Sequence, residues 1–134
     1  MNTITVTSHI AATPDQVWNT IGDPSAISAW HPAIASSDVS GTSRLCTLAD
    51  GAQIKERIES VEAAERAYTY TITESPLPLS DYRSTLRVSE EGSGAVVEWT
   101  ARFEANGAPV EDVVGILTGV YQAGLGALRA KFGG

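Results

Sequence analysis

The chain has 134 residues, the size of one ordinary domain, and its 43% hydrophobic and 19% charged content is typical of a globular rather than a disordered protein. Sixteen Asp and Glu against nine Lys and Arg give a formal net charge of −7; this charge repels phosphate backbones and anionic headgroups, so we expect no nucleic-acid partner and no charge-driven membrane docking. Cys46 is the only cysteine, which excludes an internal disulfide, and no segment resembles a signal peptide or a bilayer span, so we expect a single cytoplasmic domain over residues 1–134 with no stable membrane insertion.

The N-terminal quarter predicts one strand followed by two short helices. Residues 4–10 alternate between apolar side chains and threonine, serine or histidine, which is typical of a half-buried strand. Residues 13–16, Thr-Pro-Asp-Gln, predict a helix start in which the threonine is the N-cap and the glutamine completes a capping box. Residues 23–24, Asp-Pro, repeat this signal, and the second helix should end at Trp30-His31, before a proline.

The middle of the chain predicts a meander of antiparallel strands. Residues 53–61, 67–74, 82–88 and 95–104 alternate or are rich in β-branched and aromatic side chains, and residues 43–48 form a weaker strand whose inward side the pattern does not assign. Threonines on the same side of separate strands indicate an antiparallel sheet with one solvated face. Another element must therefore cover the opposite face.

A long helix predicted over Pro109 to Phe132 is able to cover that face. Its apolar arc contains Val110, Val113, Leu117, Val120, Tyr121, Leu128 and Phe132. Gly124 falls within the arc, whereas Gly115, Gly119 and Gly126 lie opposite it. Each interior glycine costs about 0.5–1 kcal/mol relative to alanine, so tertiary contacts must hold this helix. The three opposite glycines leave two interpretations open: a thin solvated face, or the close approach of a second chain in a homodimer.

The series of one strand, two short helices, a meander and a C-terminal helix resembles the START-like (SRPBCC) superfamily, which includes the birch-pollen-allergen fold and a polyketide cyclase/dehydrase and lipid-transport family. The matching segments are residues 12–18, 30–32, 51–58, 68–72, 75–78, 97–99 and 124–125. The resemblance implies an α+β helix-grip fold, in which a curved antiparallel sheet of about six or seven strands wraps around the C-terminal helix and leaves a cavity between them. Because such folds serve carriers, receptors and cyclases alike, the fold does not choose the function.

Strand alternation gives a candidate lining for that cavity. From the meander and the C-terminal helix, we expect a ligand to contact Ile54, Glu56, Ile58, Tyr70, Ile72, Tyr82, Ser84, Leu86, Trp99, Phe103, Leu117, Tyr121 and Gly124. Arg44 is the expected partner of Glu56, as the resemblance also favours, and the resemblance places Trp30 and His31 at the cavity mouth. The alternative is that the apolar members of this set simply fill the core.

Two carboxylates are the informative members, because a core position should not hold an unpaired charge. Alternation points Glu56 and Glu74 into the cavity, where each needs water or a partner. A bulge that shifts the strand by one residue would instead turn them to solvent.

Three functions stay open, and the first is our expectation. It is the binding or carriage of a small hydrophobic or polycyclic ligand without a cofactor, because the sequence contains no metal-ligand cluster, phosphate loop or dinucleotide fingerprint. The second is a polyketide cyclase or dehydrase, with Glu56 or Glu74 as general base and Tyr70 or Tyr82 bonded to a developing enolate. The third is a protein-interaction or chaperone-cofactor module.

Overall fold

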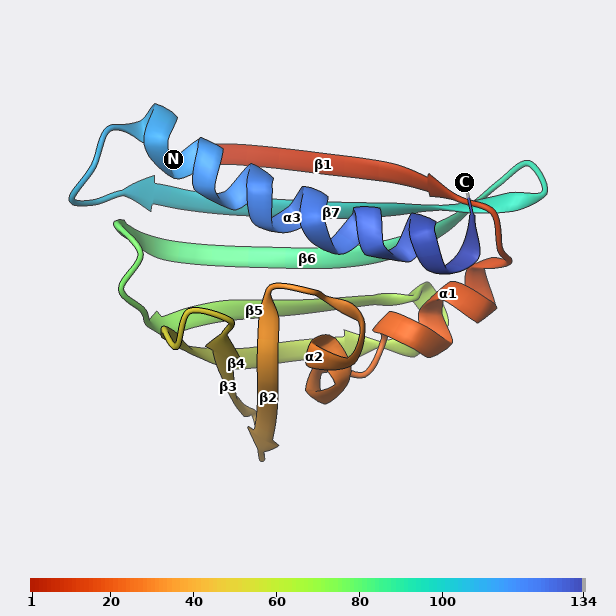
Figure 1. The fold of residues 1–134 in the computed structure, drawn as a ribbon, viewed down its shortest axis with the longest axis horizontal. Coiled ribbons are helices and arrows are strands. Elements are labelled where there is room, and N and C mark those ends of the chain that lie inside the picture. Colours follow the sequence, from red (N-terminus) through yellow and green to blue (C-terminus); the bar gives the residue numbers. More distant parts are fainter. Residues whose placement is uncertain (134) are drawn as a thin grey trace.

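The fold of residues 1–133, described by a computed structural model, is a curved antiparallel sheet with a long helix across its inner face (Figure 1). Its seven strands lie in the order β1-β7-β6-β5-β4-β3-β2. They are β1 (Asn2–Ile10), β2 (Ile34–Ser40), β3 (Ser43–Leu48), β4 (Gln53–Glu62), β5 (Ala67–Glu74), β6 (Leu79–Glu91) and β7 (Gly94–Ala105). The α+β helix-grip fold that the resemblance implied is therefore confirmed.

The helices between β1 and β2 begin where the capping signals predicted. They are α1 (Pro14–Ile21), the 3-10 turn η1 (Pro24–Ala26) and α2 (Ile27–Trp30). The capping box is present, because the Gln16 amide donates to Thr13 Oγ1 at 3.2 Å and the Thr13 amide donates to Gln16 Oε1 at 2.9 Å. Asp23 caps η1 by accepting from the Ser25 amide at 2.9 Å. These caps replace intrahelical partners that the first turns lack.

Most predicted strands are found within a few residues of their predicted limits, but β2 is a strand that the sequence analysis missed. Its burial pattern explains why, since Ile34 is its one fully buried residue. As the edge strand beyond β3, it has no covered face to impose alternation. The solvated outer face carries the expected threonines, and hydroxyl pairs join Thr69 to Thr85 and Thr5 to Thr100.

The long helix α3 (Val110–Phe132) follows its predicted range closely and lies along the sheet (Figure 1). Its buried residues are Val113, Leu117, Tyr121, Gly124, Leu125 and Leu128. By length and composition alone, α3 is long and apolar enough to cross a membrane. In the fold, its buried face packs on the sheet.

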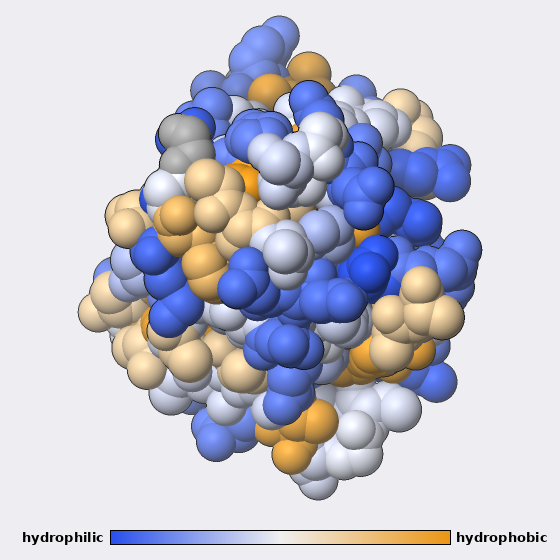
Figure 2. Space-filling model, turned by 90° about the vertical axis from the view of Figure 1, so that its right-hand side faces the viewer, coloured by the Kyte–Doolittle hydropathy of each residue, from blue (hydrophilic) through white to orange (hydrophobic). Residues whose placement is uncertain are grey.

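The outer side of α3 carries small residues, and there the homodimer interpretation stays a prediction. At Gly115 and Gly119, an added Cβ would have no heavy atom of the described residues within 4 Å, apart from the two chain neighbours and the nearby backbone of α3 itself. At the end of the molecule that carries α1 and the C-terminus, hydrophilic residues are interspersed with apolar ones (Figure 2).

Candidate functional site

A cavity of about 260 Å³ lies between α3 and the inner faces of β3 to β7. This volume is at the lower edge of the ~300–1,000 Å³ range of small-molecule pockets. The cavity reaches the surface beside Asp50, which is exposed, and Ile116, which is 39% exposed. Its lining is mostly apolar, with a few polar side chains on the sheet side.

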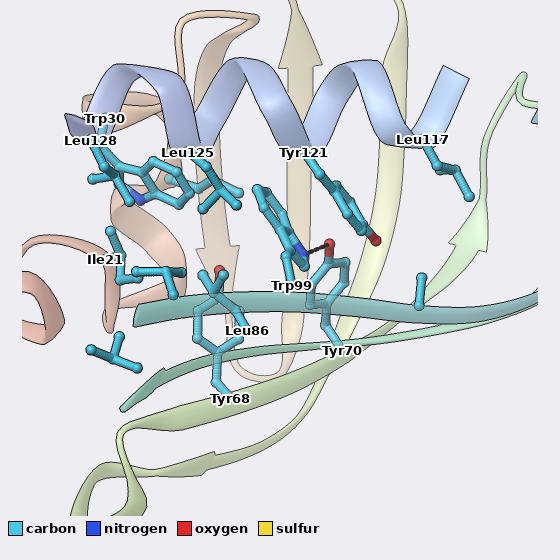
Figure 3. Close-up of a cluster of buried hydrophobic side chains, with 14 of the residues drawn as sticks. Ile21, Trp30, Tyr68, Tyr70, Leu86, Trp99, Leu117, Tyr121, Leu125 and Leu128 are labelled. Atoms are coloured by element: carbon cyan, nitrogen blue, oxygen red, sulfur yellow. Dashed lines mark hydrogen bonds between the residues drawn. The ribbon is translucent and has the colours of Figure 1, made fainter. Parts of the chain in front are cut away.

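Eight of the predicted ligand-binding residues line this cavity. They are Ile54, Glu56, Tyr70, Ile72, Tyr82, Trp99, Leu117 and Tyr121. Figure 3 shows Leu117 and Tyr121 pointing from α3 toward the sheet, with the rings of Trp99 and Tyr121 side by side. These two rings stack with their centroids 4.2 Å apart and their planes 4° from parallel. The stack forms one wall of the cavity.

The other eight predicted residues do not line the cavity. They are Trp30, His31, Arg44, Ile58, Ser84, Leu86, Phe103 and Gly124. Leu86 and Phe103 are buried in the core, Arg44 lies behind Glu56, and Ser84 lies behind Tyr121. Alternation identifies an inward face correctly, but it cannot separate residues that border a void from residues that pack against a neighbour.

Nine lining residues were absent from the predicted set. They are Ile27, Ala33, Ile34, Cys46, Leu48, Asp50, Leu77, Ile116 and Val120. Most come from α2, β2, β3 and loops, where the sequence pattern was weak or its facing unassigned. One signal was present: since Arg44 pairs with the inward Glu56, alternation along β3 also turns Cys46 and Leu48 inward.

The ion pair between Arg44 and Glu56 is the charged centre of the site, and its prediction is confirmed. Arg44 Nε donates to Glu56 Oε1 at 2.7 Å, and Arg44 Nη1 donates to the Pro24 carbonyl at 2.9 Å and to Tyr68 Oη at 3.3 Å. The guanidinium also lies over the Tyr70 ring, 4.7 Å from its centroid. Burial alone would lower the pKa of Arg44, but Tyr68 and Glu56 raise it above its ordinary value, so the group stays charged.

Cys46 completes this centre as a proton donor rather than as a nucleophile. Its Sγ donates to Glu56 Oε1 at 3.2 Å. Burial, reinforced by the Glu56 carboxylate, raises the pKa of the Cys46 thiol to about 12. The thiol is therefore protonated at neutral pH.

The prediction that Glu74 faces the cavity is wrong. Its side chain is 70% exposed, and its Oε2 lies 2.9 Å from Lys55 Nζ. A β-bulge between Lys55 and Glu56 shifts the pairing of β4 with β5, so the outward Lys55 lies opposite Glu74. One carboxylate, that of Glu56, thus remains at the inner end of the cavity, while that of Asp50 lies at the mouth.

The placement of Trp30, His31 and Gly124 at the cavity is also wrong, because these residues form a packed contact beneath α3. His31 Nε2 donates to the Val120 carbonyl at 2.7 Å, and its Nδ1 accepts from the Ala33 amide at 3.1 Å. These two partners define the neutral tautomer. Burial lowers the pKa of His31, which keeps the ring neutral. A Cβ at Gly124 would lie 2.6 Å from His31 Cδ2, so glycine permits the close approach.

A chain of buried hydroxyl groups runs along the sheet side of the cavity. Trp99 Nε1 donates to Tyr70 Oη at 3.3 Å, as the dashed line in Figure 3 marks. Tyr70 Oη lies 3.1 Å from Tyr82 Oη, which is also hydrogen-bonded to Tyr121 Oη. Tyr121 Oη in turn lies 3.0 Å from Ser84 Oγ. Burial raises the pKa of all three tyrosines well above its ordinary value, so each phenol keeps its proton.

Metal-ligating side chains do not gather at this site. Within residues 1–133, no three His, Cys, Asp or Glu side chains lie close enough together to hold a metal ion.

The comparisons with known proteins agree with this architecture. The profile of the family described as "Polyketide cyclase / dehydrase and lipid transport" matches residues 1–133. The chain is similar to the solved structure of XoxI from Bacillus cereus, at 35% identity and a TM-score of 0.96, covering 98% of this chain and 96% of that one. It is also similar to an uncharacterized protein from Bacillus thuringiensis, at 34% identity and a TM-score of 0.94, covering 98% of both chains.

A more distant similarity supports the fold alone. Norcoclaurine synthase from Thalictrum flavum is 20% identical with a TM-score of 0.76, covering 96% of this chain and 84% of that one. No curated protein sequence matches the chain.

Proposed function

The chain belongs to the polyketide cyclase / dehydrase and lipid transport family. From this membership and from the cavity beneath α3, we propose that the protein binds one small, largely apolar molecule in that cavity. Family and fold indicate a hydrophobic-ligand-binding domain. The observation that carries the proposal is the cavity of about 260 Å³, bounded by apolar side chains on both the helix and the sheet. Burying apolar ligand surface there contributes about 25 cal/mol per Å².

The cavity volume narrows the size of the guest. A cavity of about 150 Å³ accepts benzene, which has six carbons. If the required volume grows in proportion to the number of carbons, a two-ring aromatic with ten carbons needs about 250 Å³. The cavity of about 260 Å³ is of that size. We therefore expect molecules of one or two rings to fit, and sterols or long acyl chains to require rearrangement of α3.

Ligand binding has more support than cyclase or dehydrase chemistry, although the family description includes both. A general base for that chemistry would have to be Glu56, since Glu74 faces solvent. Glu56 Oε1 already accepts from Arg44 and Cys46. Such contacts are those of a structural anion that organises the cavity wall, and they favour a binding role. A cytoplasmic location belongs to the same proposal, because the free thiol of Cys46 suits a reducing compartment.

The test measures binding of naphthalene derivatives to the wild-type protein and to a variant with a filled cavity. Calorimetric titration and thermal shift should both detect 2-methylnaphthalene with the wild type. Leu117→Trp should abolish the signal, because residue 117 lies on the cavity wall. Gln122→Trp adds the same side chain to the exposed side of α3 and should leave binding unchanged.

Mass spectrometry of small molecules extracted from the purified protein would identify a native guest. If the wild type binds no one- or two-ring compound, or if folded Leu117→Trp binds as well as Gln122→Trp, the cavity is not the binding site and the proposal fails.

A further inference from the structure

The chain of hydroxyl groups beside the cavity has a fixed direction. Ser84 Oγ lies 3.0 Å from the Thr100 carbonyl, which can only accept, so the single Ser84 proton is used there. Ser84 must then accept from Tyr121. By the same count Tyr121 accepts from Tyr82, and Tyr82 accepts from Tyr70. Tyr70 accepts from Trp99 Nε1.

This direction uses every side-chain donor on the cavity wall. Four of these donors, the Trp99 indole and the three tyrosine hydroxyls, donate along the series of hydroxyl groups. The fifth, the Cys46 thiol, donates to Glu56. Each tyrosine oxygen keeps one lone pair, because a hydroxyl can accept twice. Glu56 Oε2 also keeps its lone pairs, since the side chains described in residues 1–133 make no hydrogen bond to it. The side chains of the wall can therefore accept hydrogen bonds but have none to donate.

The charges around the cavity also disfavour a guest that carries an acceptor or a negative charge. Asp50 adds a second carboxylate at the mouth. The nearest cation, Arg44, is paired with Glu56 and does not line the cavity. Its Nη2 is buried and lacks a hydrogen-bond partner among the described residues, but the guanidinium carbon lies over the Tyr70 ring, 4.7 Å from its centroid, and Tyr70 lines the cavity whereas Arg44 does not. An anionic guest would thus meet acceptors and carboxylates, with desolvation of its charge uncompensated.

We propose that the cavity selects apolar one- or two-ring molecules whose polar group is a hydrogen-bond donor, such as a phenol, an alcohol or an amine, over molecules whose polar group is an acceptor or an anion. This selection rests on the proposed function, because it concerns the same cavity. A donor group on the guest can form a hydrogen bond to the oxygen of a tyrosine or of Glu56. An ether or ketone oxygen loses its water partners and gains none.

Two matched pairs of ligands test the selection by calorimetric titration of the wild-type protein. 2-Naphthol and 2-methylnaphthalene differ by a hydroxyl against a methyl group, and 2-methoxynaphthalene and 2-ethylnaphthalene differ by an ether oxygen against a methylene. We expect 2-naphthol to bind about fivefold tighter than 2-methylnaphthalene, the worth of one net hydrogen bond. The ether should bind more weakly than the ethyl compound, and 2-naphthoate should bind more weakly than 2-methylnaphthalene.

A variant at the end of the chain tests its direction. Ser84→Ala removes the acceptor of the Tyr121 proton, which becomes available to a guest. The affinity of the ether relative to the ethyl compound should then rise about fivefold. Ser89→Ala, at an exposed position of the same strand β6, should leave this ratio unchanged. Circular dichroism checks that both variants are folded.

The outcomes separate the two proposals. If the hydrocarbons bind but the wild type prefers the ether or the carboxylate, the donor selection is wrong and the proposed function stands. If folded Ser84→Ala keeps the wild-type ratio, the assigned direction is wrong and the selection loses its basis. If neither hydrocarbon binds, the proposed function fails and this inference fails with it.

Discussion

Two glycines on α3 should respond to the same substitution with opposite signs. A Cβ at Gly124 would lie 2.6 Å from His31 Cδ2, 3.0 Å from His31 Nε2 and 3.0 Å from Trp30 Cζ3. Apart from its two chain neighbours and the nearby backbone of α3 itself, a Cβ at Gly119 would have no heavy atom of the described residues within 4 Å. Gly124→Ala therefore tests a packed contact, whereas Gly119→Ala tests helix propensity alone.

The magnitudes follow from these contacts. Replacing an interior helical glycine by alanine gains up to about 1 kcal/mol, so Gly119→Ala should raise the free energy of unfolding by about 0.5–1 kcal/mol. At Gly124 the same gain is opposed by overpacking of about 1–3 kcal/mol. The His31 ring can move away only by weakening its bonds to Val120 and Ala33, each worth about 1 kcal/mol. We expect Gly124→Ala to lower the free energy of unfolding by about 1–4 kcal/mol.

Urea denaturation followed by circular dichroism measures both changes. A double-mutant cycle adds the cause, because Gly124→Ala in a His31→Ala background should lose most of its cost. If Gly124→Ala proves as stable as wild type, or if its cost persists without the His31 ring, then the close approach of α3 to His31 is not what requires glycine there.

Three further predictions concern titratable groups in the core. Arg44→Met should lower the free energy of unfolding, measured by urea denaturation, by about 3–5 kcal/mol, because Glu56 is left buried and unpaired. Adding Glu56→Met should recover most of that loss. A double variant as unstable as the single one would contradict the pairing account. Burial lowers the pKa of His31 below its usual 6.5, so stability is fully present above pH 6.5 and declines as the pH falls from 6.5 to the folded-state value. His31→Gln should flatten this decline in denaturation curves from pH 7 to pH 5, and a slope removed equally by the exposed-site control His9→Gln would refute the assignment. The Cys46 thiol, with its pKa raised to about 12, should resist iodoacetamide at pH 8 and react only in denaturant, as mass spectrometry would show, whereas rapid modification of the folded protein would contradict its burial.

The sequence predicts elements well where one face is covered and poorly where none is. The range predicted for β5 equals the observed one, because buried aromatic side chains alternate there with threonines. The edge strand β2 was missed, because Ile34 is its one fully buried residue and the remainder of β2 carries no alternation to read.

Side-chain facing fails where an irregularity or a distant partner decides it. Alternation places Glu56 correctly but not Glu74, because the pairing shift at Lys55 has no signature in the sequence of β5. Gly124 is correctly placed on the buried arc of α3, yet its neighbour is His31 and not the cavity. The period of one helix fixes which side is buried; it cannot tell which segment of the chain fills the space opposite.

The contact between α3 and His31 lies next to the cavity, because Val120 both accepts the hydrogen bond of His31 and lines the cavity. Gly124 lets the C-terminal half of α3 approach His31 and Trp30 closely, and Leu125 and Leu128 are buried in that half. The gap between α3 and the sheet lies on the N-terminal side of this contact. The gap opens beneath the turns that carry Leu117 and Tyr121, and these side chains reach the cavity wall without filling the space. A glycine that costs helix stability thus allows the close contact of α3 with His31 and Trp30, beside the cavity that we propose binds a guest.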